Sequence, residues 1–184
     1  KPDYIHIHDW HTGAVAALLH DHYHKDPFFA KTKCVYTIHN LAYQGIFPKG
    51  RVLDLLPLDY TKYENTETIN LMALGIQYAN KVTTVSPSYA NEILSDPYGE
   101  GLQYLLRHES NKLSGILNGI DGKVYGCDTD KLIDFRFDKE NYKEGKRENK
   151  KALLEQLKFN VEESIDVPLI AIISRLAFQK GMDL

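Results

Sequence analysis

The chain has 184 residues, enough for one ordinary domain or parts of two, and 43% of them are hydrophobic, which excludes a disordered tail. A formal net charge of -3 argues against broad electrostatic binding to nucleic acid or to a membrane surface. No apolar stretch approaches the ~20 residues needed to span a bilayer, so we expect no membrane partner.

The ends and the cysteines indicate the setting of the chain. Cys34 and Cys127 have no paired or metal-binding spacing, so we interpret them as reduced thiols. No signal peptide is present, and the chain begins with Lys1 in a segment typical of an interior strand with its lead-in. We therefore expect a fragment of a longer cytoplasmic chain (a plastid chain if it comes from a plant) that lacks material at both ends.

Five short apolar runs are typical of strands, and helical patterns separate most of them. The expected strands are residues 4–8, 34–39, 81–85, 113–117 and 169–174. The expected helices are residues 13–23, 65–80 and 142–157, with another that starts at Ser86 and Pro87. Residues 46–63 show little pattern and are expected to be irregular. This alternation predicts an α/β fold with a parallel, Rossmann-like sheet.

A domain boundary is expected near Asn111 and Lys112. The run 113–117 looks like the first strand of a new sheet, and a polar stretch then leads through a helix to the strand expected at 169–174. Residues 1–111 would thus end one α/β domain, and residues 112–184 would begin another.

The first candidate site is the segment 6–13, where a strand end meets a helix start. Ligands of open α/β sheets bind outside the carboxyl ends of the strands. Asp9 can accept hydrogen bonds from hydroxyls, and Trp10 offers a flat apolar face for a sugar ring. The pair His6 and His8 also resembles the start of a metal-hydrolase site, and structural packing is a third interpretation. The residue types leave all three open.

Two further polar residues follow expected strands. His39 comes after the apolar run 34–38 and could donate to a substrate hydroxyl or a developing charge, although a structural role is also typical of a lone histidine there. Asn118 lies in an Asn-Gly pair, which is first of all a turn signal. Its amide could also reach into a cleft between domains. Histidines 20, 22 and 24 are interpreted as a solvated helix end.

The last candidate site holds two cations. Arg175 stands at the carboxyl end of the expected strand 169–174, and Lys180 lies five positions further along, before Gly181. Arginine can bind phosphate through two hydrogen bonds, and lysine supplies a compact charge. Together they suit a phosphate or a departing diphosphate, while the alternative is a solvated basic loop.

Several strings together resemble the bacterial glycogen synthase and plant starch synthase family. They are residues 8–13 (HDWHTG), 37–45 (TIHNLAYQG), 78–80 (YAN) with 82–87 (VTTVSP), 113–121 (LSGILNGID), and 174–176 (SRL) with 179–181 (QKG). They occur in the family's order over nearly the whole chain, and TIHNLAYQG is the most distinctive. The resemblance implies a two-domain GT-B glycosyltransferase.

The resemblance also implies an activity and a set of roles. The reaction would transfer glucose from ADP-glucose to the 4-hydroxyl at the non-reducing end of an α-1,4-glucan, with retention and without a metal or other cofactor. Asp9 and Trp10 would line the glucose and acceptor side of the cleft, with Asn118 near the same sugar. His39 would hydrogen-bond the transferred glucose. Arg175 and Lys180 would hold the diphosphate.

Departures from the family limit this expectation. The family's Lys-x-Gly-Gly-Leu loop and its Glu-Pro-Cys-Gly-Leu segment are absent from the chain. We therefore expect little or no synthase activity from these residues alone. The alternatives are another GT-B glucosyltransferase with a different donor, a non-catalytic glucan-binding remnant, and the metal-dependent hydrolase built on His6 and His8.

Overall fold

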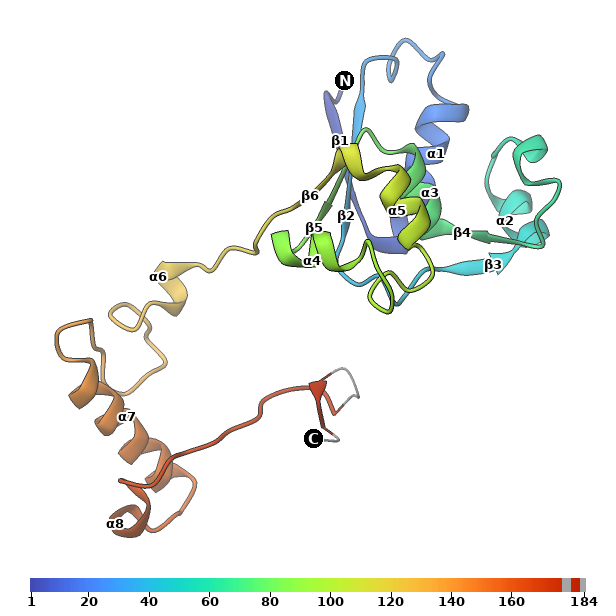
Figure 1. The fold of residues 1–184 in the computed structure, drawn as a ribbon. Coiled ribbons are helices and arrows are strands. Elements are labelled where there is room, and N and C mark those ends of the chain that lie inside the picture. The colour runs from blue at the N-terminus through green and yellow to red at the C-terminus, as the bar shows by residue number, and fades with distance from the viewer. Residues whose placement is uncertain (177–179, 183–184) are drawn as a thin grey trace. The chain divides into compact units, whose positions relative to one another are not determined.

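The structure is a computed structural model that describes residues 1–176 and 180–182. It divides into two compact units, Lys1–Asn118 and Gly119–Leu184 (Figure 1). Each unit is described by itself. Among the described residues, no helix is both long and apolar enough to cross a membrane.

A four-stranded parallel sheet forms the centre of the first unit (Figure 1). Its strands are β1 (Tyr4–His8), β2 (Lys33–Ile38), β5 (Lys81–Thr84) and β6 (Leu113–Gly115), in the order β1-β2-β5-β6. Every neighbouring pair is parallel. The parallel α/β fold expected from the sequence is confirmed. All four carboxyl ends therefore meet at one edge of the sheet.

Two helices pack together beside this sheet because small residues let their backbones approach. They are α1 (Asp9–Asp21) and α3 (Leu71–Tyr78). A Cβ added to Gly13 in α1 would lie 2.0 Å from the backbone oxygen of Leu71. Gly75 in α3 leaves room in the same way for the ring of Tyr36 on β2. Tyr36 is fully buried, and it belongs to the main core of the unit.

The segment expected to be irregular is ordered. It contains β3 (Ile46–Pro48), α2 (Lys49–Leu55) and a 3₁₀ turn, η1 (Tyr60–Tyr63), and β3 pairs antiparallel with β4 (Thr68–Asn70). The helix expected over 65–80 is correspondingly shorter, because β4 occupies its first part. The Asn70 side chain accepts from the backbone N–H of Ala73, so α3 begins immediately after it. A second core lies under these elements.

A helix begins after β5 at the residues expected from the sequence. Helix α4 (Pro87–Glu92) has Ser86 as its N-cap, and the Ser86 hydroxyl accepts from the backbone N–H of Tyr89 at 3.1 Å. Helix α5 (Gln103–His108) and a 3₁₀ turn, η2 (Ser110–Lys112), then lead to β6. Strand β6 pairs with β5 of the same sheet, so the prediction that it opens a new sheet is wrong. Both β5 and β6 lie within the first unit, which ends at Asn118.

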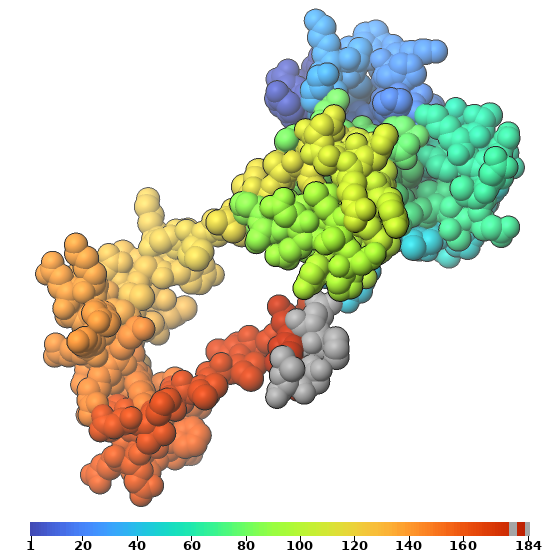
Figure 2. All heavy atoms as spheres, viewed as in Figure 1, coloured from blue at the N-terminus to red at the C-terminus, as the bar shows by residue number. Residues whose placement is uncertain are grey.

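Among its described residues, the second unit contains helices joined by turns and irregular segments, and no strand. They are α6 (Gly122–Tyr125), α7 (Tyr142–Gln156) and α8 (Val161–Ser164), and α7 agrees with the helix expected there. The strand expected over 169–174 is absent, and Ile170 and Ile173 are 86% and 98% exposed. In Figure 2 this orange-red segment runs as a thin extended chain. A strand needs a partner strand for its backbone hydrogen bonds, and no other strand is present among the described residues of this unit.

Candidate active site

The candidate site is built at the carboxyl edge of the parallel sheet. Strand β1 ends at His8 and is followed by Asp9, while β2 ends at Ile38 and is followed by His39. His8 and Thr37 are register partners, so the two strands end almost level. The sheet therefore brings Asp9 and His39 together although thirty positions separate them in the sequence.

Asp9 ties the two strand ends to each other. Its Oδ1 accepts hydrogen bonds from the backbone N–H of His39 (2.8 Å) and of Asn40 (3.3 Å). The Asp9 backbone has φ 51°, in the left-handed region, which is uncommon for a residue other than glycine. Strained backbone of this kind persists where surrounding contacts hold it, and it gathers at functional sites. The first role of Asp9 in this structure is thus to hold the start of the loop that carries His39.

His8 and His39 form a hydrogen-bonded pair, which sequence reasoning did not identify. His8 Nδ1 lies 3.0 Å from His39 Nε2, so one ring donates and the other accepts. Burial, followed by the charges that His6 and His39 would carry, lowers the pKa of His8. The His8 ring is therefore neutral at neutral pH, and it restricts the tautomer and orientation of His39.

His6 belongs to a different set of contacts. Its Nε2 lies 2.7 Å from the hydroxyl of Thr37, which in turn is 2.6 Å from the hydroxyl of Thr83. This row of polar groups crosses β1, β2 and β5. Within the part of the chain that the structure describes, no three His, Cys, Asp or Glu residues are grouped as a metal site requires. The metal-hydrolase interpretation of His6 and His8 therefore has no geometric support.

Trp10 stands beside a shallow hollow of about 490 Å³. The hollow is lined by Trp10, Ala42, Tyr43, Gln44, Gly45, Ile46 and Glu100. The Trp10 ring stacks on His11 with centroids 3.9 Å apart and also packs near Phe47. The Trp10 ring also lies close to Gly45: a Cβ added to Gly45 would be 2.3 Å from Trp10 Cε3. The loop after β2 and the indole ring therefore shape this hollow together.

Gln44 fastens the same loop to its surroundings, and sequence reasoning did not single it out. Its Nε2 donates to the backbone oxygen of Glu100 (2.7 Å), and its Oε1 accepts from Nδ2 of Asn70 (2.6 Å). Both polar ends of the amide are thus engaged with groups far away in the sequence. The signal available in the sequence was its place inside the string TIHNLAYQG.

The remaining candidates are described within their own units. Asn118 is exposed at the end of the first unit. Arg175 and Lys180 belong to the second unit and are exposed. The strand that was expected to present Arg175 is not formed, so its proposed phosphate contact and that of Lys180 stay predictions.

Comparison with known proteins identifies the family. A family model described as "Starch synthase catalytic domain" matches residues 1–108. The chain belongs to this family. It is 48% identical to a glycogen synthase of Bacillus licheniformis and 45% identical to one of Streptococcus gordonii, over all of this chain in both cases. Those alignments cover 38% and 39% of the two relatives, so the chain spans well under half of their length.

A solved structure supports the same assignment. The catalytic domain of starch synthase IV from Arabidopsis thaliana, bound to ADP and acarbose, matches with a TM-score of 0.88 and 36% sequence identity. The match covers all of this chain and 38% of the plant chain. The expected family and its GT-B type of fold are therefore confirmed. Asp9, Trp10 and His39 lie in the strings on which the resemblance was based, and the structure places all three at one edge of the sheet.

Proposed function

We propose that this chain forms part of a glucan synthase that transfers glucose from ADP-glucose to the non-reducing end of an α-1,4-glucan, with retention. The single observation that supports this best is the arrangement at the carboxyl edge of the sheet. There Asp9 holds the backbone at His39, His8 orients its ring, and Trp10 borders an open hollow. Membership of the family and the ADP and acarbose bound to the plant relative agree with it.

Each residue would contribute a specific interaction to the transfer. The Trp10 ring would pack against the apolar face of a sugar, and His39 would hydrogen-bond the transferred glucose. The bond from the anomeric carbon to the diphosphate oxygen breaks, and a bond to the acceptor 4-hydroxyl oxygen forms. The proton of that hydroxyl passes to the departing diphosphate. Arg175 and Lys180 would stabilise the charge that develops there, with Asn118 near the sugar.

The same proposal gives a role to the two units. Residues 1–111, which were expected to end the acceptor-side domain, lie within the first unit, and β6 extends its sheet as far as Gly115. Residues 112–184, the second expected segment, would begin the nucleotide-sugar domain, apart from β6, which belongs to the first sheet. Transfer requires both domains to close on the donor. We therefore expect the 184-residue chain alone to transfer little or no glucose. The cytoplasmic location expected from the sequence also stays a prediction.

A segment exchange tests the proposal. The chain aligns over its whole length with the Bacillus licheniformis glycogen synthase, so it can replace the corresponding segment of that enzyme. The assay measures transfer of labelled glucose to glycogen from ADP-glucose and, in parallel, from UDP-glucose. We expect activity with ADP-glucose, and a loss of about 100- to 1,000-fold in the His39→Ala variant.

A matched variant separates a catalytic loss from a folding defect. His108 is exposed in α5, does not line the hollow and makes none of the hydrogen bonds of the site, so His108→Ala should leave the rate unchanged. Lys180→Ala tests the diphosphate contact in the same background. A folded exchange protein that transfers no glucose, or one in which His39→Ala behaves like His108→Ala, would contradict the proposal.

A further inference from the structure

A row of hydrogen bonds through two side-chain amides joins three segments of the first unit. Asn70 Nδ2 donates to Gln44 Oε1 (2.6 Å), and Gln44 Nε2 donates to the backbone oxygen of Glu100 (2.7 Å). The backbone oxygen of Gln44 is also engaged, because it accepts from the N–H of Met72 at 3.1 Å. Gln44 therefore links the start of α3 to the segment around Glu100.

Backbone groups at the two ends of this row determine which way each amide points. The N–H of Ala73 can only donate, so it contacts Oδ1 of Asn70 (3.0 Å), and Asn70 presents Nδ2 to Gln44. Gln44 must then accept through Oε1, which leaves Nε2 for the carbonyl of Glu100, a group that can only accept. Each amide is thus satisfied in one orientation only, and reversing either of them would bring like groups together.

The carbonyl that Gln44 contacts belongs to a turn with unusual backbone. The N–H of Leu102 donates to the oxygen of Gly99 at 2.7 Å. Between these two residues, Glu100 and Gly101 have φ 48° and 83°. Two successive positive φ values are typical of a type I′ turn, and a residue with a Cβ is uncommon in that region. Such backbone persists where surrounding contacts hold it, and the bond from Gln44 is a contact of this kind.

This turn forms one side of the hollow beside Trp10. Glu100 and Gln44 line the hollow together with the Trp10 ring, so a shift of the turn would change its shape. Among the described residues that line it, Glu100 is the only one that carries a charge, and that charge is negative. A carboxylate disfavours an anionic diphosphate but accepts hydrogen bonds from sugar hydroxyls. Beside the flat face of an indole, it suits a neutral glucan.

We propose that Gln44 is a positioning residue for the glucan acceptor: by holding the backbone at Glu100, it keeps the hollow beside Trp10 in the shape that binds the non-reducing end of the glucan. Both polar ends of the Gln44 amide are occupied, so Gln44 acts through the turn and not on the sugar. The identity of the ligand rests on the proposed function, whereas the positioning role rests on these hydrogen bonds.

Fluorescence of Trp10, the single tryptophan, tests this on the full 184-residue chain. The emission is followed during titration with maltotetraose and, in parallel, with ADP. We expect a saturable change with maltotetraose and none with ADP. Gln44→Glu keeps an acceptor for Asn70 but removes the donor to Glu100. The dissociation constant of maltotetraose should therefore rise roughly 3- to 10-fold, the fold-change that corresponds to one hydrogen bond.

Asn70→Asp tests the same contact from the other end of the row, without a change in the loop itself. The introduced carboxylate can still accept from the N–H of Ala73, so the start of α3 is kept. It presents a second acceptor to Gln44, whose amide must reverse and lose its bond to Glu100. Asn70→Asp should weaken maltotetraose binding by a similar factor, and it decides the matter if Gln44→Glu fails to fold.

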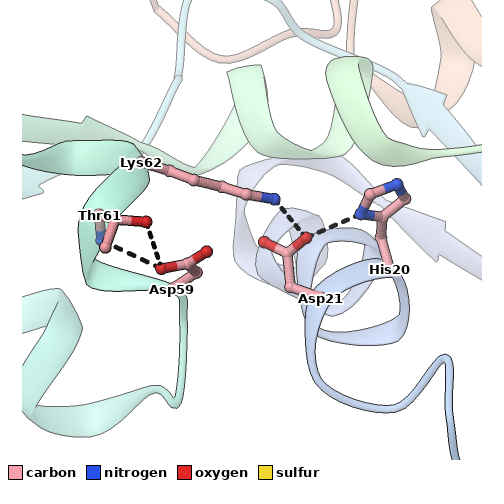
Figure 3. Close-up of polar contacts among 5 residues, drawn as sticks. All are labelled: His20, Asp21, Asp59, Thr61 and Lys62. Carbon is pink, nitrogen blue, oxygen red and sulfur yellow. Dashed lines mark hydrogen bonds and ion pairs between the residues drawn. The ribbon is translucent and has the colours of Figure 1, made fainter.

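Two control variants separate positioning from a change of charge or of stability. Gln77→Glu makes the same chemical change at an exposed residue of α3 that does not line the hollow, so it should not alter binding. Lys62→Met removes the ion pair with Asp21, which joins η1 to α1 outside the hollow (Figure 3). Lys62→Met should lower the urea midpoint, while the dissociation constant of maltotetraose stays at the parental value.

The pH supplies a signature that a general loss of stability would not give. In Gln44→Glu, the introduced carboxyl becomes a donor when it is protonated, and its O–H can restore the bond to Glu100. The ratio of the dissociation constants of the variant and the parent should therefore fall towards one as the pH drops to about 4.5, near the ordinary glutamate pKa of ~4.3. For Gln77→Glu this ratio should stay near one throughout.

Three results would overturn the proposal. They are an emission that responds to ADP or to neither ligand, binding of maltotetraose by Gln44→Glu and Asn70→Asp as tight as by Gln77→Glu, and a weakening in Gln44→Glu that persists unchanged at low pH. If the segment-exchange enzyme transfers no glucose but the expected changes in binding are observed, only the proposed function fails. If the enzyme transfers glucose but Gln44→Glu binds maltotetraose like the parent, only the positioning role fails.

Discussion

Replacing Gly45 with alanine should disrupt the candidate site through two separate effects. Gly45 has φ 62°, in the left-handed region, where an L-residue with a Cβ costs roughly 1–2 kcal/mol. The new Cβ would also lie 2.3 Å from Trp10 Cε3, so the indole or the loop must move. Overpacking of this kind typically costs about 1–3 kcal/mol.

Together these effects predict a loss of about 2–5 kcal/mol in the free energy of unfolding of the first unit. Trp10 is the single tryptophan of the chain, so its fluorescence reports directly on this site. In urea denaturation followed by that fluorescence, the midpoint should fall by roughly 1–2 M for Gly45→Ala. The emission of the native variant should also shift, because the ring loses its present packing.

Gly50→Ala supplies the matched control. Gly50 lies in α2, has no atoms within 4 Å of an added Cβ, and does not have a positive φ. Alanine there should be neutral or stabilising by up to about 1 kcal/mol. The reasoning would be refuted if Gly45→Ala unfolded at the same urea concentration as Gly50→Ala with unchanged native emission.

Three other measurements test the site and its sheet. Asp9→Ala should lower the free energy of unfolding of the first unit by about 1.5–3 kcal/mol, measured by urea denaturation. Asp9→Asn should lower it by less, because the amide oxygen can still accept from the N–H of His39. Equal losses in the two variants would contradict this. Because the pKa of His8 is lowered from its usual 6.5, the unfolded state binds more protons just below that pH. Stability should therefore fall as the pH drops through about 6.5, and a His8→Gln variant with the same pH profile as the parent would disprove it. Burial raises the pKa of Cys34 to about 11. A thiol reagent at neutral pH should therefore modify the exposed Cys127 in the native chain, and Cys34 only after unfolding. Labelling of Cys34 in the native chain would contradict its burial.

The strands of the parallel sheet could be predicted because their signals are local. Strand β1 spans the expected residues, β2 begins and ends one residue earlier than expected, and β5 ends one residue earlier. The short pair β3 and β4 was missed for the opposite reason. Each has three residues, and they pair across a helix and a 3₁₀ turn, so no short window of sequence contains the signal.

The site was predicted in outline, while its contacts were not. The rule that ligands bind at the carboxyl ends of parallel strands placed Asp9 and His39 at one edge. It could not show that Asp9 holds the backbone at His39, or that His8 is bonded to its ring. Those contacts depend on how the side chains meet after the strands have paired.

The sequence by itself determined the family, the parallel α/β class and the residues that follow β1 and β2. These properties follow from the order of short strings and from apolar periodicity along the chain. Tertiary structure decided which groups are paired and which apolar runs become strands. The run 169–174 has the composition of a buried strand but pairs with no strand among the described residues. Asp21 lies beside histidines that were expected to form a solvated helix end, but its side chain is buried against Lys62. The physical reason is the same in both cases: hydrogen bonds and burial are completed by groups that are distant in the sequence.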